Sequence, residues 1–213
     1  MSARIVVVLL RRSTVMVAQR TRYSVVAMLL HWVIAALILA NIWYGWQMGQ
    51  LKGLAQYELF QLHKSIGISV LILSLVRVGW RLVAAPPPLP ASMTRFERAI
   101  AGATHWIFYG FMIVLPLTGW VIVSASPYNL PTVLFKTVPW PHLAFVHDLP
   151  MMTRKLIEDQ VGDVHEWLAW SLLGLVVLHV AAAIKHLVWD RDDVAARMIP
   201  FLRRQGASIS SEI

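Results

Sequence analysis

The chain has 213 residues, of which 58% are hydrophobic and 14% are charged, with a mean hydropathy of +0.62. A soluble domain of this length needs far more polar surface, so the composition excludes that class and indicates an integral membrane protein. The net charge of +8 is first a topology signal in a membrane protein, and we expect no nucleic-acid partner.

Four apolar runs follow one another along the chain, at residues 25–47, 62–83, 99–124 and 164–189. Each reaches the roughly 20 residues that an α-helix needs to cross a hydrocarbon core of about 30 Å. None shows the strict alternation of a half-buried strand. The sequence therefore predicts an all-α fold, an integral membrane four-helix bundle over residues 23–201.

The segments outside these runs are expected to form tails and connecting loops. We expect a tail at residues 1–22, a flexible polar tail at 202–213 and a short loop at 48–61. The long connection at 125–163 is rich in proline and has room for a short interfacial helix near residues 151–158.

Basic residues are unevenly divided between the two sides of the predicted bundle. Of the 19 Lys and Arg residues, fourteen lie in or beside the termini and the second connection. By the positive-inside rule both termini are cytoplasmic, and the first and third connections face the periplasm. The five residues on this outer side are Lys52, Lys64, Lys136, Arg154 and Lys155.

Histidines carry the chemical signal. Ionisable groups inside a membrane are costly, so several together indicate a functional site. The absence of cysteine excludes thiolate iron–sulfur ligation and covalent haem attachment. Six of the eight histidines lie in or at the edges of the apolar runs: His31, His63, His105, His165, His179 and His186.

The fourth run gives the clearest geometry. His165 and His179 are 14 residues apart, which on an α-helix separates them by about 40° in azimuth and roughly 21 Å along the axis. One helix face therefore presents one imidazole near the outer leaflet and another in the inner half.

Partners for these two imidazoles are available on other helices. His63 lies at the level of His165, and His31 lies in the inner half with His179. Paired imidazoles on opposing helices leave room for a flat macrocycle, so we expect two non-covalent b-type haems rather than zinc. Depth alone does not select the inner pair, because His105 and His186 also lie in the inner half.

Two cations fit such sites. Arg77 follows His63 by 14 residues on nearly the same face, at the inner level, where a haem propionate would supply its anion. Lys64, beside His63, is similarly placed for a propionate of the outer haem.

The motifs that contain these histidines resemble the bacterial cytochrome b561 family over about residues 21–201. This resemblance implies that His31 and His179 bind the inner haem iron and that His63 and His165 bind the outer haem iron. It implies that His105 and His186 line a quinone pocket near the inner surface, whereas His142 and His147 match nothing in the family and are expected to be solvated. The matching segments are Arg22-Tyr23-Ser24, His31-Trp32, His63-Lys64-Ser65-Ile66-Gly67, Trp80-Arg81, Leu115-Pro116-Leu117-Thr118-Gly119 and His165-Glu166.

Within that family the chain is similar to small single-chain superoxide:ubiquinone oxidoreductases. We therefore expect a multi-pass protein of a bacterial inner membrane, in contact with lipid, that oxidises superoxide on the periplasmic side and reduces ubiquinone. The long connection has four acidic and three basic residues, so its local charge does not favour an anionic substrate.

Two alternatives use the same histidines. The chain could be the membrane electron-transfer subunit for a periplasmic dehydrogenase, hydrogenase or soluble cytochrome. A haem-free transporter with a histidine path is the third hypothesis, but acidic residues deep in the spans would then be expected, and the sequence has none there.

Overall fold

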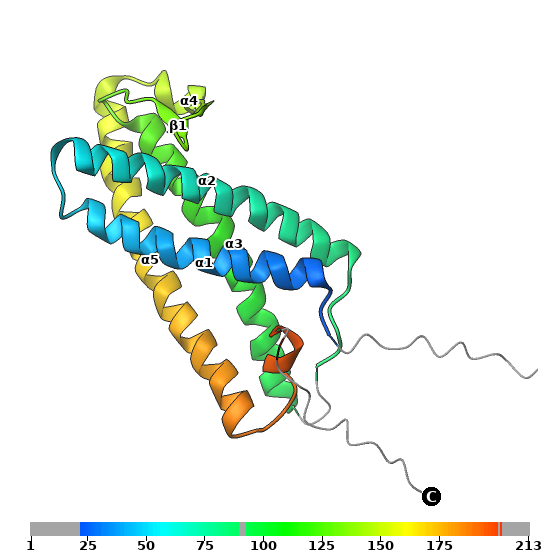
Figure 1. Ribbon diagram of the computed structural model, residues 1–213. Coiled ribbons are helices and arrows are strands. Elements are labelled where there is room, and N and C mark those ends of the chain that lie inside the picture. The colour runs from blue at the N-terminus through cyan, green and yellow to red at the C-terminus, as the bar shows by residue number, and fades with distance from the viewer. Residues whose placement is uncertain (1–21, 90–92, 200, 202–213) are drawn as a thin grey trace, which may run out of the picture.

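The computed structural model describes residues 22–89, 93–199 and 201 (Figure 1). Four helices are long and apolar enough to cross a membrane: α1 (Val25–Met48), α2 (Gly53–Val83), α3 (Arg95–Ala125) and α5 (Met151–Val188). The predicted all-α membrane bundle is confirmed. The predicted tails lie outside the described residues except for Arg22.

The predicted spans are correct in number and differ mainly in their ends. The helix α2 starts at Gly53, so most of the expected loop at 48–61 is helical. The expected interfacial helix near 151–158 is wrong as a separate element, because α5 runs without a break from Met151 through the fourth span. Nothing in this stretch interrupts the helical hydrogen bonds, since α5 contains no proline.

Side-chain caps fix the starts of α1 and α3. Ser24 accepts a hydrogen bond from the Ala27 N–H at the start of α1, and its hydroxyl also accepts the Trp80 indole N–H from the end of α2. Thr94 and Glu97 form a reciprocal capping box at the start of α3. These caps satisfy backbone donors that the first helical turn leaves without partners.

The four long helices form two antiparallel hairpins. The helix α1 packs along α2, and α3 packs along α5, while the hairpins meet along α2 and α3. In the described residues, α5 packs closely against neither α1 nor α2. We call the two ends of the bundle the His63 end and the His31 end.

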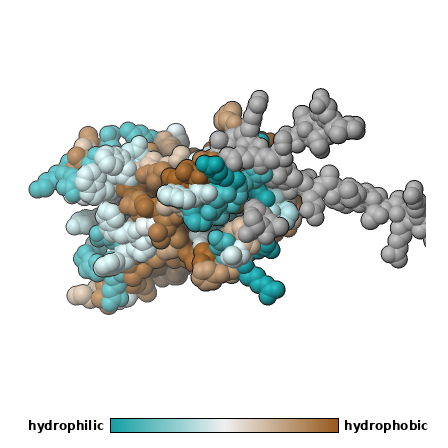
Figure 2. All heavy atoms as spheres, turned by 90° about the horizontal axis from the view of Figure 1, so that it is seen from below, coloured by the Kyte–Doolittle hydropathy of each residue, from teal (hydrophilic) through white to brown (hydrophobic). Residues whose placement is uncertain are grey.

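The buried core is small and most large apolar side chains face outward. The core residues are Ile34, Ile38, Ile66, Val70, Tyr109, Met112 and Leu172. On α5, by contrast, Leu178 is 68% exposed and Val177 60% exposed. Hydrophobic surface lies between hydrophilic groups on the face shown in Figure 2. Such outward apolar side chains suit contact with lipid tails.

A small β-hairpin lies over the His63 end, which the sequence did not predict. Strand β1 (Thr132–Leu134) pairs antiparallel with β2 (Val138–Trp140), and the turn places Phe135 and Lys136 at positive φ. We call residues 131–140 the hairpin segment. The short helices α4 (Ala144–His147) and η1 (Ala195–Arg197) complete the described elements.

The hairpin segment is held on α2 by polar side chains that flank His63. Gln61 donates to the Pro131 carbonyl at 2.7 Å and accepts from the Val133 N–H at 3.3 Å. Ser65 accepts from the Phe135 N–H at 2.9 Å. The segment is therefore fixed to the turn of α2 that carries His63.

Candidate functional site

Two predicted ligands face each other at the His63 end. The rings of His63 on α2 and His165 on α5 have centroids 6.2 Å apart. A metal–imidazole bond of about 2 Å on each side of one ion puts two ring centres about 6 Å apart. The separation therefore fits two imidazoles that would hold one haem iron between them.

Hydrogen bonds set the tautomer of both rings. The His63 Nδ1 lies 3.0 Å from the Asn41 carbonyl oxygen, which only accepts, so Nδ1 is the protonated nitrogen. The Thr118 hydroxyl donates its proton to the Leu115 carbonyl and therefore accepts from His165 Nδ1 at 2.9 Å. Both rings keep the Nε2 lone pair free, which is the arrangement of an oriented imidazole ligand.

Glycines give these two rings their space. A Cβ atom on Gly45 of α1 would lie 3.1 Å from His63 Cε1, and one on Gly119 of α3 would lie 3.3 Å from His165 Cε1. Both contacts are tighter than ordinary van der Waals distances. Each ring therefore needs a residue without a side chain on the neighbouring helix.

The two rings open into a cavity of about 520 Å³, which we call the His63 cavity. This volume lies in the range of cofactor pockets, and the lining is mainly apolar with a few polar groups. The described residues thus fit a haem at this end. Besides the histidines and glycines, the lining includes Trp46, Phe60, Phe111, Met112, Leu115, Trp120, Trp140 and Trp170.

Three imidazoles meet at the His31 end. His179 on α5 has its ring centroid 6.3 Å from that of His31 and 6.4 Å from that of His105. Distance does not separate the two pairings. The packing of the helices differs between the two pairings. His105 lies on α3, which packs along α5, whereas His31 lies on α1, which does not pack closely on α5. A macrocycle needs a gap between the helices that carry its ligands, and this favours His31.

Arg77 lies at this same end, as its spacing predicts. Its guanidinium donates to the Ala27 carbonyl at 2.9 Å, and a second nitrogen lies 3.4 Å from His31 Nδ1. No carboxylate forms an ion pair with Arg77 among the described residues. The side chain is therefore placed to meet an anionic group beside His31.

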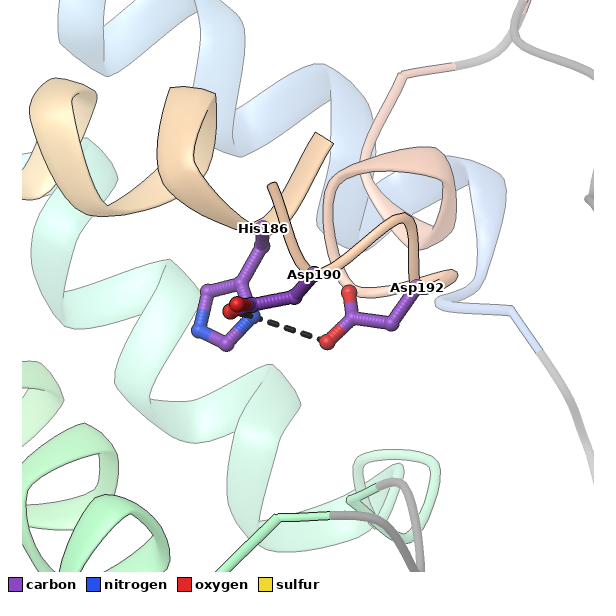
Figure 3. A group of neighbouring side chains, drawn as sticks. All are labelled: His186, Asp190 and Asp192. Atoms are coloured by element: carbon purple, nitrogen blue, oxygen red, sulfur yellow. Dashed lines mark hydrogen bonds and ion pairs between the residues drawn. The ribbon is translucent and has the colours of Figure 1, made fainter. Parts of the chain in front are cut away.

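The predicted quinone residues have different surroundings. His105 lines a small pocket with Arg77, Arg81 and Tyr109, and His186 is not among the residues that line it. His186 Nδ1 instead lies 2.8 Å from an Asp192 carboxylate oxygen and 3.0 Å from Asp190 (Figure 3). The sequence interpretation missed this carboxylate pair, since both acids follow the end of α5 and come together through the turn after it.

The ligating atoms of His186, Asp190 and Asp192 lie within 4.8 Å of one another, close enough to share a metal ion. Lys185 Nζ, however, already contacts Asp190 at 2.6 Å. An ammonium group at that distance opposes a second cation. The cluster is better suited to proton exchange than to metal binding.

His142 and His147 are not the solvated loop residues that the sequence analysis expects. Their rings lie 5.1 Å apart, their Nδ1 atoms are 3.4 Å apart, and both side chains are half-buried. Burial, followed by the neighbouring His147, lowers the pKa of His142 below its ordinary value. His142 therefore favours the neutral form.

A 14-residue spacing recurs in all four long helices and relates the two hairpins. By this spacing α1 corresponds to α3, and α2 corresponds to α5. Arg77 in the first hairpin then occupies the position that His179 occupies in the second hairpin. The two hairpins are therefore alike at the His63 end and different at the His31 end. The four spacings are His31 to Gly45, His105 to Gly119, His63 to Arg77 and His165 to His179.

Comparison with known proteins agrees with this geometry. The family model described as prokaryotic cytochrome b561 matches residues 22–201. The chain belongs to the prokaryotic cytochrome b561 family. Membership implies b-type haem and electron transfer in a membrane, and with four spanning helices it makes the chain a multi-pass bacterial membrane protein.

The chain aligns with nearly the whole length of three relatives. Cytochrome b561 homolog 2 of Escherichia coli K12 is 32% identical over 181 residues, 84% of this chain and 91% of the relative. Probable superoxide oxidase CybB of Yersinia pestis is 24% identical over 183 residues, 84% and 96% of the two chains. Cytochrome b561 homolog 1 of E. coli K12 is 24% identical over 188 residues, 84% and 97%.

The glycine contact at His63 gives a direct test of the site. Gly45→Ala should weaken haem retention about tenfold, because the new methyl group displaces an oriented ligand ring. Gly110→Ala is the matched control, since a Cβ there meets nothing within 4 Å. Haem per protein is measured after purification in detergent, and equal haem content in the two variants would contradict the contact's importance.

Proposed function

We propose that the chain is a dihaem b-type cytochrome that oxidises superoxide at its His63 end and reduces ubiquinone at its His31 end. The observation that carries this proposal is the opposed imidazoles at each end of one bundle, with centroids 6.2 Å and 6.3 Å apart. Bound haem supplies a one-electron iron couple at each level.

The proposed residue roles are supported by this geometry. His63 with His165, and His31 with His179, present imidazole nitrogens to the two irons. Arg77 holds a propionate beside His31. The superoxide role is supported by the relative named probable superoxide oxidase, which is 24% identical, and by the family resemblance of the histidine motifs.

Two superoxide anions are needed to reduce one ubiquinone by two electrons. Two superoxide anions become two O₂ molecules and release two electrons, and these reduce one ubiquinone, which takes up two protons. His105 and His186 belong to the quinone end. His186, with Nδ1 held by Asp192, is oriented to pass protons from the adjacent aqueous side to the reduced quinone.

We also propose the orientation given by the positive-inside rule, with both termini cytoplasmic in a bacterial inner membrane. The His63 end and its hairpin segment then face the periplasm, where superoxide would arrive. Protons for ubiquinone are taken up at the opposite end.

A second function is favoured by exposed apolar side chains on the connection between α3 and α5. Tyr128 is 78% exposed, Phe145 73% and Phe135 55%, all outside the long helices. Exposed apolar groups of this kind suit the docking of a protein partner. The chain would then be the membrane subunit for a periplasmic dehydrogenase, hydrogenase or soluble cytochrome.

The ligand roles predict distinct losses of haem. His165→Ala should lose one haem of two, because the ring that faces it cannot hold iron alone. His186→Ala should keep both and slow quinone reduction. Absorption spectra with haem stoichiometry provide the measurement, and a haem lost from His186→Ala would show that the ligands are assigned wrongly.

The donor can be tested with the purified chain by itself. Superoxide generated enzymatically should reduce its haem and, in turn, added ubiquinone, with no other protein present. Superoxide dismutase should abolish the reaction. If the purified chain reduces quinone only after a periplasmic redox protein is added, the second function is correct and the first is not.

The orientation predicts reporter activity at defined sites. A fluorescent protein that matures in the cytoplasm should fluoresce when it is fused to the C-terminus. Alkaline phosphatase, which needs periplasmic disulfides, should be active when it is fused after Tyr128 and inactive at the C-terminus. The reversed pattern would refute the orientation.

A further inference from the structure

The cations near the His63 end differ in how their charge is compensated. Lys136 pairs with Glu58 at 3.1 Å, and Lys155 pairs with Glu158 and Asp159 at 3.1 Å and 2.7 Å. These ion pairs are exposed, and they leave little net field at the surface.

The two remaining cations besides Lys64, Arg154 and Lys52, lie away from the His63 cavity. Arg154 donates to the Ala125 and Ser126 carbonyls and to the Asn129 side chain, so its guanidinium holds the connection together. Lys52 is exposed at the start of α2. Neither lines the His63 cavity.

Lys64 and Arg154 are both only 8% exposed, but of the two only Lys64 lines the His63 cavity. Its ammonium donates to Thr132 Oγ1 at 3.1 Å and to the Pro131 carbonyl at 3.4 Å, and it lies 4.9 Å from the Phe60 ring centre. All three partners are neutral. Among the described residues no carboxylate forms an ion pair with it.

A buried ammonium without a counter-charge is costly, and neutral acceptors offset only part of the cost. An ammonium has three N–H donors, and the hairpin segment accepts two. A donor and a full positive charge thus remain beside the cavity that contains His63 and His165. That arrangement selects a negatively charged oxygen.

We propose that Lys64 is an oxyanion-binding group of the His63 cavity. Two sources can supply the oxygen: a propionate of the haem held by His63 and His165, or superoxide entering from the adjacent aqueous side. The inference rests on the proposed function for the haem in this cavity. It assigns to Lys64 the binding of an anion inside the cavity, which the exposed cations near this end do not line.

The test compares three variants of the full-length, haem-loaded protein in detergent. Lys64→Gln removes the charge and keeps an amide that can donate to the hairpin segment. Thr132→Val keeps the charge and removes a contact between Lys64 and that segment. Lys136→Gln removes an exposed charge from the same segment and serves as the surface control.

Two measurements distinguish the sources of the oxyanion. If a propionate is bound, Lys64→Gln should lower the midpoint potential of the haem at this end. We expect about a tenfold change in the reduction equilibrium constant, which for one electron is about 59 mV. If superoxide is bound, the rate of haem reduction by superoxide should fall about tenfold and lose its dependence on ionic strength.

Either result in Lys64→Gln alone supports the proposal. An unchanged potential together with an unchanged rate would overturn it. The same change in Thr132→Val would assign the effect to the position of the hairpin segment, and the same change in Lys136→Gln would assign it to surface charge. Both of those results would also overturn the proposal.

Failure of the proposed function is recognised separately in the parent protein. If the parent holds two haems that superoxide does not reduce, the superoxide function fails, while the comparison of potentials still tests Lys64. If Lys64→Gln leaves both measurements unchanged in a parent that superoxide does reduce, the Lys64 proposal alone fails.

Discussion

The arrangement depends on imidazole rings that face each other about 6 Å apart across helices that do not pack together. Direct packing within each hairpin and between α2 and α3 fixes the backbone. The same packing leaves α5 apart from α1 and α2, and the His63–His165 and His31–His179 pairs span these gaps. Backbone hydrogen bonds are satisfied inside each helix, so a membrane bundle can keep such gaps for a cofactor.

The supporting contacts differ between the two ends. At the His63 end, hydrogen bonds to the Asn41 carbonyl and the Thr118 hydroxyl hold both Nδ1 protons in place, and a glycine faces each ring. At the His31 end, Arg77 contacts Nδ1 of His31 and has the repeat position that His179 has in the other hairpin. A repeat with one histidine replaced by arginine offers a cation for a propionate where a symmetric repeat would offer another ligand.

The hairpin segment connects the surface to the buried site. It is held by Gln61, Lys64 and Ser65, which flank His63 on the same stretch of α2. A change in the segment therefore acts on the helical turn that carries the ring. The exposed aromatic side chains of the same connection form the surface on which the second proposed function would dock a protein partner.

The sequence by itself determined the four spans, the membrane class and the shared helix face of His165 and His179, because hydropathy and a 14-residue spacing depend only on local geometry. It could not determine the hairpin segment, the Asp190–Asp192 pair beside His186 or the contact between His142 and His147. Those depend on how irregular connections fold back on the helices. Depth along the helices leaves both His31 and His105 as partners for His179, and only the tertiary structure shows that His105 lies on a helix that packs along α5, because depth says nothing about which helices pack together.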